Sequence, residues 1–163
     1  AAAGVDASNA PKGMILKLPV DSDVSARKLR AEFQKVVKPI GVIITDTMGR
    51  AWRLGLTDNA IGVAGVTTLL DYRGQKDAAG RTLEQSVAAV ADEIASTAEL
   101  VKGKLAQIPV VLVRGLSQYV LAEDGPGARS VVRPPEEDLF GLGSEMAERR
   151  GYLRGFEDGK NER

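Results

Sequence analysis

Apolar residues recur with a helical period in two regions of the chain. In the first region they lie three or four positions apart: Ala26, Leu29, Phe33 and Val36. This spacing predicts a helix with one buried stripe, capped at Ser22 or Asp23 and ended near Val37 by Pro39. The charged residues of this segment are expected on its solvent face: Arg27, Lys28, Arg30, Glu32 and Lys35.

The second helical pattern covers residues 82–102. Its apolar stripe consists of Leu83, Val87, Val90, Ile94, Ala98 and Val101. Asp92 and Glu93 flank the stripe, and solvation accounts for them better than metal binding does. Gly103 is suited to the position just after this helix, because glycine adopts a left-handed conformation without a Cβ penalty.

Short apolar runs outside these helices predict β-strands at residues 14–18, 42–44, 60–66 and 108–113. Together the elements predict a mixed α/β (α+β) fold, in which one mixed sheet is packed by two long amphipathic helices. Asp46 then follows strand 42–44 at its carboxyl end, where open α/β sheets tend to place ligands. The glycines of 60–66 match no phosphate-binding fingerprint, so close backbone packing is the better explanation.

The other segments are predicted to be connections. Residues 71–80 form a polar, turn-rich loop whose charges either order over a substrate or keep the loop soluble. Turns and a Pro-broken extended stretch follow Ser117, and the residues from Ser144 onward are strongly charged. We expect one domain over residues 1–140 and a charged C-terminal helix or tail over residues 141–163.

Composition then restricts the chemistry. The 163 residues carry 22 basic and 22 acidic side chains, so no global charge attracts nucleic acid or an anionic membrane. The sequence contains no His and no Cys, which excludes Ser-His-Asp catalysis, His-ligated or thiolate zinc and disulfides. We expect no membrane span and no signal peptide, and a cytoplasmic location is the simpler interpretation.

Two short segments place a carboxylate among small, oxygen-bearing residues. Residues 4–9 contain Asp6 and Asn9, and residues 45–50 contain Asp46 and Thr47. Mg²⁺ prefers such oxygen ligands and keeps open positions for water and phosphate. Either segment alone is ordinary turn chemistry, because Asp, Ser and Asn bond their own backbone. Together they predict a metal and nucleotide-phosphate site in which Asp6 and Asp46 share a cation, with carboxylates within roughly 6 Å.

Arg50 and Arg53 flank Trp52, the only Trp of the chain. One interpretation is a pair of guanidinium groups that bind phosphate or carboxylate. The other is a Trp at the edge of the core with both Arg side chains in solvent. Residues 49–53 are expected to form a loop in either case.

Several motifs occur in an order that resembles the coenzyme F420-0:gamma-glutamyl ligase family. They are Asp-Ala-Ser-Asn, Thr-Asp-Thr-Met-Gly-Arg-Ala-Trp-Arg, Ala-Ile-Gly-Val-Ala-Gly, Asp-Tyr-Arg-Gly-Gln-Lys-Asp, Ala-Val-Ala-Asp-Glu and Ile-Pro-Val-Val-Leu-Val-Arg-Gly. The match covers about residues 1–140, and Arg-Pro-Pro-Glu-Glu-Asp-Leu-Phe resembles the actinobacterial version. Residues 1–140 would then be the glutamyl ligase domain.

The resemblance implies a GTP-dependent ligase that adds L-glutamate to coenzyme F420-0 through an acyl phosphate, within a homodimer. It implies Mg²⁺ or Mn²⁺, two ions, and allows K⁺. Position by position, Asp6 and Asp46 match metal ligands, Thr47 matches a ligand of a second metal, and Asn9 matches a nucleotide contact. Gly103 and Lys104 match part of the GTP-binding segment. No catalytic residue is firmly assigned, and from the neutral charge we expect no nucleic acid and no membrane as partner.

Family members carry a substantial region before the Asp-Ala-Ser-Asn motif, with further GTP contacts. We therefore expect this chain to correspond to the C-terminal portion of the ligase domain. On its own it would bind Mg²⁺ or Mn²⁺ weakly and ligate no glutamate. Two alternatives stay open: a non-catalytic binding or regulatory derivative of the fold, and another metal-dependent phosphotransfer enzyme.

Overall fold

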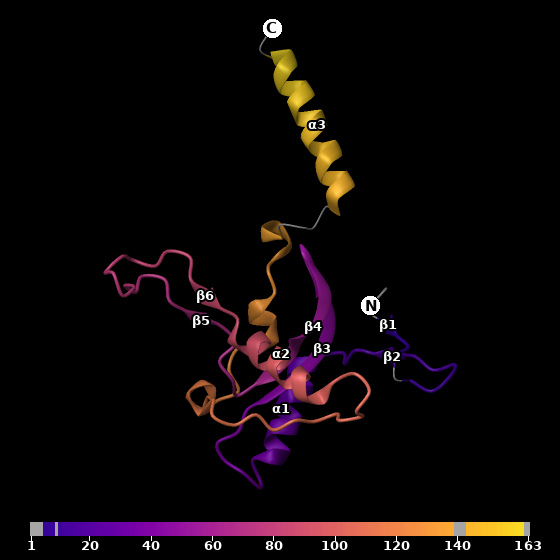
Figure 1. Cartoon of the computed structure of the whole chain (residues 1–163), viewed down its shortest axis with the longest axis vertical. Helices are drawn as coiled ribbons and strands as arrows, with labels where there is room; N and C mark the ends of the chain where they lie inside the picture. Colours follow the sequence, from indigo (N-terminus) through magenta and orange to yellow (C-terminus); the bar gives the residue numbers. More distant parts are fainter. Residues whose placement is uncertain (1–4, 9, 139–142, 162–163) are drawn as a thin grey trace. The chain divides into compact units, whose positions relative to one another are not determined.

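The protein has the mixed α/β fold that its sequence predicts (Figure 1). The computed structural model describes residues 5–8, 10–138 and 143–161, and the chain divides into two units, residues 1–131 and 132–163. The first unit contains β1 (Val5–Asp6), β2 (Leu16–Lys17), α1 (Ser22–Phe33), β3 (Val42–Arg50), β4 (Arg53–Ala64), β5 (Leu70–Asp71), β6 (Val87–Ala88), α2 (Val90–Lys102) and the 3₁₀ turns η2 (Ser117–Tyr119) and η3 (Ala128–Val131). The second contains η4 (Pro135–Glu137) and α3 (Gly143–Asn161).

The strands form three antiparallel pairs, β1 with β2, β3 with β4, and β5 with β6. The expected single mixed sheet is therefore wrong for the described residues. The long β3–β4 hairpin joins the predicted strands 42–44 and 60–66 into one ladder. Residues 49–53, expected to form a loop, belong mostly to this hairpin, because Arg50 ends β3 and pairs with Arg53, the first residue of β4.

Helix α1 buries a different face from the predicted one. Ala26 is fully buried, but Leu29 and Phe33 are exposed by 46% and 40%. The helix ends at Phe33, before the expected end near Val37, and Val36 beyond it is 90% exposed. The buried face instead carries Asp23 and Arg30, which were expected to cap the helix and to face solvent. Asp21 is the actual N-cap, and its carboxylate accepts a hydrogen bond from the Val24 amide at 2.8 Å.

Helix α2 begins at Val90 rather than at residue 82. The preceding residues belong to the β5–β6 arm, which consists of β5, β6 and the residues between them (70–88). In this arm the Leu83 amide donates to the Gln75 carbonyl at 2.8 Å, and the Tyr72 amide donates to the Ser86 carbonyl at 2.9 Å. Antiparallel pairing thus satisfies these backbone groups, although the apolar spacing also suits a helix. Gly103 is the C-cap of α2 as expected, with a left-handed φ of 55°.

Side chains from α1 and α2 cover the edge of β4 that does not pair with β3. Asp92, expected in solvent, accepts from the Ala60 amide at 2.9 Å, and Asp23 accepts from the Val63 amide at 2.8 Å. Ser96 donates to the Asp58 carbonyl at 2.8 Å. An uncovered edge would leave these backbone groups available for pairing with another chain. The small core beside this edge consists of Ala60, Val63, Val66, Ala91, Ala95 and Ala128.

Close helix–strand approach explains Gly62 of β4. A Cβ atom at this position would lie 2.3 Å from the Ser22 carbonyl oxygen of α1. The expectation that the glycines of 60–66 serve backbone packing is therefore confirmed here.

Residues 108–113 do not form the predicted buried strand. The segment pairs with no strand among the described residues, and its Val110 and Leu112 are 71% and 67% exposed. The short strand expected at 14–18 is present as β2. No helix in the described part of the chain has the length and apolarity that crossing a bilayer requires.

Candidate functional site

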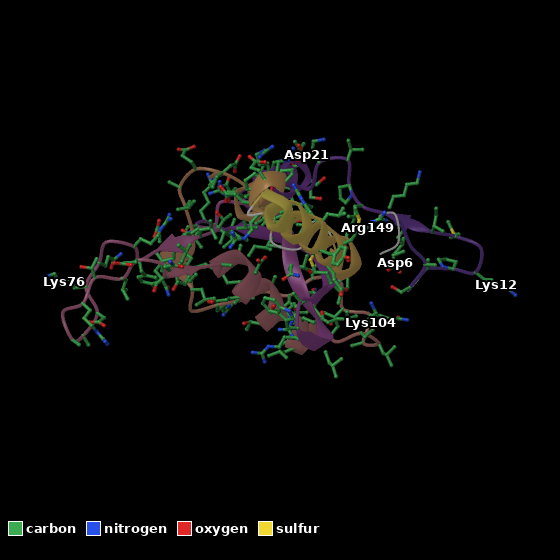
Figure 2. The ribbon with its side chains drawn as sticks, turned by 90° about the horizontal axis from the view of Figure 1, so that it is seen from above. Asp6, Lys12, Asp21, Lys76, Lys104 and Arg149 are labelled. Carbon is green, nitrogen blue, oxygen red and sulfur yellow. The ribbon has the colours of Figure 1, made fainter. Side chains whose placement is uncertain are left out.

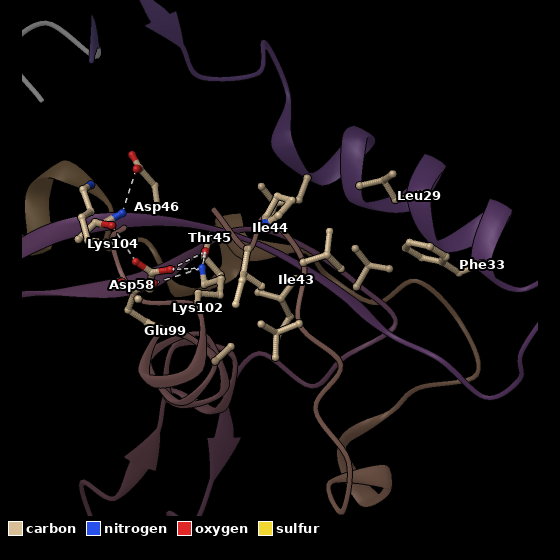
Figure 3. Close-up of a pocket in the computed structure, with 18 residues that line it drawn as sticks. Leu29, Phe33, Ile43, Ile44, Thr45, Asp46, Asp58, Glu99, Lys102 and Lys104 are labelled. Atoms are coloured by element: carbon tan, nitrogen blue, oxygen red, sulfur yellow. Dashed lines mark hydrogen bonds and ion pairs between the residues drawn. The ribbon is translucent and has the colours of Figure 1, made fainter. Parts of the chain in front are cut away.

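A pocket of about 490 Å³ lies between β3, the C-terminal turn of α2 and residues 103–111 (Figure 3). One end is apolar, with Leu29 and Phe33 of α1 beside Ile43 of β3. The other end is polar and combines residues of both signs of charge: Thr45, Asp46, Thr47, Asp58, Glu99, Lys102 and Lys104. The pocket therefore offers an apolar wall for a ring system and a polar end for charged groups.

Asp46 and Thr47 occupy the middle of β3, so the expectation that Asp46 follows the end of its strand is wrong. Successive strand residues point to opposite faces, and the two side chains therefore leave β3 on different sides. A register shift between Ile44 and Thr45 immediately precedes them, and such irregularities redirect side chains next to functional sites. The Asp46 carboxylate accepts from the Thr47 amide at 2.9 Å.

Asp58 of β4 lies directly opposite Thr47 and is only 2% exposed. Its Oδ1 accepts from Thr47 Oγ1 at 2.8 Å, and its Oδ2 accepts from Thr45 Oγ1 at 2.7 Å and from Lys102 Nζ at 2.5 Å. Burial would raise the pKa of Asp58, but the hydrogen bonds from Lys102, Thr45 and Thr47 outweigh it and lower the pKa below 3.8. Asp58 is therefore ionised at neutral pH.

Asp6 is the last residue of β1 and is exposed (Figure 2). Its carboxylate accepts hydrogen bonds from the hydroxyl and the amide of Ser8. These two bonds lower the pKa of Asp6 below 3.8, and the positive charge of Lys104 lowers it further. Lys104 also lines the pocket together with Asp46. That Asp6 and Asp46 share one cation stays a prediction.

The structure separates the other predicted site residues. Gly103 and Lys104 line the pocket directly after α2. Arg50 and Arg53 lie at the exposed tip of the β3–β4 hairpin, outside the lining of this pocket. Trp52 between them is 90% exposed and covers no core. Asn9 lies outside the described residues.

Sequence reasoning missed Asp58 and Lys102, which form the buried ion pair of the site. An Asp inside a strand is unusual, and that is the one local signal at residue 58. Its partners are remote in sequence, because Thr47 precedes it by 11 residues and Lys102 follows by 44. Only the β3–β4 register and the docking of α2 bring them together.

The donor set suits a hard cation such as Mg²⁺. The described residues contain no group of three or more acidic, His or Cys side chains that could enclose a metal. Mg²⁺ commonly uses one or two carboxylates, and takes its remaining ligands from water and substrate phosphates. Asp6, Asp46 and the Thr47 hydroxyl are ligands of that kind, and Lys104 supplies a cation for an anionic co-ligand. Binding of a divalent cation together with a phosphate-bearing ligand stays a prediction for this pocket.

Comparison with known proteins identifies the family of this chain. The model of the family F420-0:Gamma-glutamyl ligase matches residues 1–115. The chain is 46% identical over 141 residues to the coenzyme F420:L-glutamate ligase of Methanopyrus kandleri, covering 85% of this chain and 56% of that protein. It is 46% identical over 139 residues to the ligase of the same name from Methanocaldococcus jannaschii, covering 84% and 54%.

This protein belongs to the F420-0:gamma-glutamyl ligase family. A third relative, the coenzyme F420:L-glutamate ligase of Archaeoglobus fulgidus, is 46% identical over 140 residues and is covered over 55% of its length. The chain thus spans about half the length of the curated relatives it matches.

Proposed function

We propose that this protein takes part in GTP- and divalent-metal-dependent ligation of L-glutamate to coenzyme F420-0 through an acyl phosphate. The observation that carries the proposal is that Asp46, Thr47 and Lys104 all line the polar end of one pocket, in a chain of the F420-0:gamma-glutamyl ligase family. The relatives' name supplies the coenzyme and L-glutamate as substrates, and the pocket contains charged groups of the kind that phosphoryl transfer from GTP to the coenzyme precursor would use.

In the proposed reaction, a carboxylate oxygen of the coenzyme precursor attacks the γ-phosphorus of GTP. The bond from that phosphorus to the β–γ bridging oxygen breaks, and GDP leaves. The amine of L-glutamate then attacks the acyl carbon, a C–N bond forms, and the C–O bond to phosphate breaks. The amine proton passes to solvent, so the products are the amide, GDP and inorganic phosphate.

The chain's own residues contribute position and charge. Asp6, Asp46 and Thr47 would hold divalent cations, which when bound neutralise phosphate oxygens and orient the transfer. Lys102 forms an ion pair with Asp58, with 2.5 Å between Nζ and Oδ2. Lys104 forms no ion pair with a described residue, so we assign it to the phosphates of GTP. Electrostatic groups held in place before reaction are the main source of catalysis in such transfers.

The apolar wall gives the second substrate a place to bind. Leu29, Phe33 and Ile43 line the pocket opposite its charged end. A fused aromatic ring system would bury apolar surface there, while its carboxylate reaches the polar end. This arrangement would hold donor and acceptor in line, which lowers the entropic part of the barrier.

The test measures GDP release by the full-length protein with GTP, L-glutamate and coenzyme F420-0, and identifies the amide product by mass spectrometry. Asp46→Asn should lower kcat at least a hundredfold, whereas the matched change Asp77→Asn, on the exposed β5–β6 arm, should change it less than twofold. Product formation with ATP alone would contradict the GTP assignment. Absence of glutamate-dependent GDP release would favour the non-catalytic alternative.

Lys104→Met addresses the phosphate contact in the same assay. It should raise KM for GTP about tenfold, which corresponds to about 1.4 kcal/mol of lost binding. Lys76→Met is the matched control, because Lys76 is also exposed and lies far out on the β5–β6 arm (Figure 2). Equal KM values for the two variants would show that Lys104 does not bind the nucleotide.

A further inference from the structure

Two threonines of β3 donate to the same buried carboxylate, but their oxygens differ in what else they bind. Thr45 Oγ1 donates to Asp58 at 2.7 Å and also accepts from Lys102 Nζ at 2.9 Å. Thr47 Oγ1 donates to Asp58 at 2.8 Å and accepts no hydrogen bond from any described residue. The Thr45 hydroxyl is therefore enclosed in the network, and the Thr47 hydroxyl is not.

The direction of these hydrogen bonds follows from the chemistry of the groups. An ammonium group only donates, and a carboxylate paired with it only accepts. Each threonine must then point its single hydroxyl hydrogen at Asp58. The Thr47 oxygen is left with lone pairs alone, and these lone pairs suit a cation but repel a phosphate oxygen.

We propose that Asp58 is a positioning residue that orients the Thr47 hydroxyl as a ligand for a divalent cation, with Lys102 anchoring Asp58. This inference rests on the proposed function and adds to it the ion pair of Asp58 and Lys102. Asp58 is 2% exposed, so it acts through Thr47 rather than on the ligand. Its carboxylate also joins β3 to the last turn of α2, which leads directly into Gly103 and Lys104 (Figure 3).

A polar group behind a metal ligand typically changes metal affinity 10- to 100-fold when it is removed. Asp58→Asn keeps the shape of the side chain but turns an amide N–H toward one of its partners. We expect the dissociation constant for Mn²⁺ to rise about tenfold, measured by electron paramagnetic resonance titration of the full chain with Mn²⁺ alone. The spectrum of bound Mn²⁺ should also change, since its ligand field would lose the oriented hydroxyl.

A double-mutant cycle distinguishes this role from a merely structural one. Because Asp58 acts through Thr47, Asp58→Asn combined with Thr47→Val should bind Mn²⁺ within about twofold of Thr47→Val alone. Thr47→Ser keeps the hydroxyl and should retain the parental affinity. Ser96→Ala is the matched control, since it removes a 2.8 Å hydrogen bond to the backbone carbonyl of the same Asp58.

Each outcome decides one question. A parent chain that binds no Mn²⁺ overturns both the proposed metal dependence and this inference. Parental Mn²⁺ affinity in a folded Asp58→Asn variant, or additive losses in the cycle, overturns this inference alone. If Asp58→Asn does not fold, the threonine pair decides: a tenfold loss in Thr47→Val that Thr47→Ser avoids supports the inference, and unchanged affinity in Thr47→Val overturns it.

Discussion

Arg30 holds together parts of the chain that are remote in sequence, and its removal should destabilise the first unit. The guanidinium group donates to the Ile40 carbonyl at 2.9 Å, to the Leu121 carbonyl at 2.6 Å and to the Ala122 carbonyl at 3.0 Å. It also forms an ion pair with Asp124 at 2.7 Å. The side chain itself is only 5% exposed. We predict that Arg30→Met lowers the free energy of unfolding.

The magnitude follows from opposing effects. A hydrogen bond from a charged donor contributes about 1.5–3 kcal/mol, and Arg30 makes four. Burying the guanidinium costs several kcal/mol, and Met avoids that cost while it fills most of the volume. Asp124 is 44% exposed on its side chain and regains water when Arg30 is absent. The carbonyls stay less hydrated, so we expect a net loss of about 3 kcal/mol.

Urea unfolding followed by circular dichroism measures this loss. With a urea dependence of about 1–3 kcal/mol per molar, the midpoint should fall by roughly 1–3 M while the slope stays the same. Lys28→Met is the matched control, because Lys28 lies on the exposed side of α1 and should change stability by less than about 0.5 kcal/mol. A loss below about 1 kcal/mol in Arg30→Met would refute the reasoning, as would equal losses in both variants.

Two further predictions concern packing and titration. Gly62→Ala should cost about 1–3 kcal/mol in the same unfolding assay, because its Cβ would meet the Ser22 carbonyl at 2.3 Å. Gly49→Ala, with nothing within 4 Å, should cost nothing, and a similar loss in both would contradict the steric argument. Hydrogen bonds from Arg73 lower the pKa of Asp71 to about 2, so an NMR titration should give a midpoint near 2 that returns toward 3.8 in Arg73→Gln. Because the folded pKa is the lower one, any stabilisation by this pair is present above pH 3.8 and is lost as the pH falls toward 2; an unshifted Asp71 would disprove the pairing.

The sequence predicted the class of fold because the apolar pattern was strong where one face of an element is buried by apolar side chains. The period in residues 90–102 matched a helix that packs on β4, and Gly103 ended it. The same reasoning failed for residues 82–89, which pair with the other half of the β5–β6 arm. It also failed for α1, since the face with Asp23 and Arg30 is buried and satisfied by remote backbone groups.

The candidate site divides in the same way. Asp46 could be named from its segment, because a carboxylate among small, oxygen-bearing residues indicates a cation site. The roles of Thr47 and Lys104 came from the resemblance to the ligase family. Their joint presence in one pocket follows from the docking of α2 beside β3. Asp58 and Lys102 could not be identified from the sequence, because each belongs to the site only through its ion pair with the other.

By itself, then, the sequence determined which helices and strands could form. It also determined that this chain has no His or Cys side chain for chemistry, and which oxygen atoms could serve as ligands of a cation. These properties depend on residue type and on neighbours a few positions away. Tertiary structure alone decided which polar side chains are buried and which way their hydrogen bonds point. Arg30 and Asp58 are tolerated inside because donors and acceptors from distant segments meet them there, and no local pattern records such a partner.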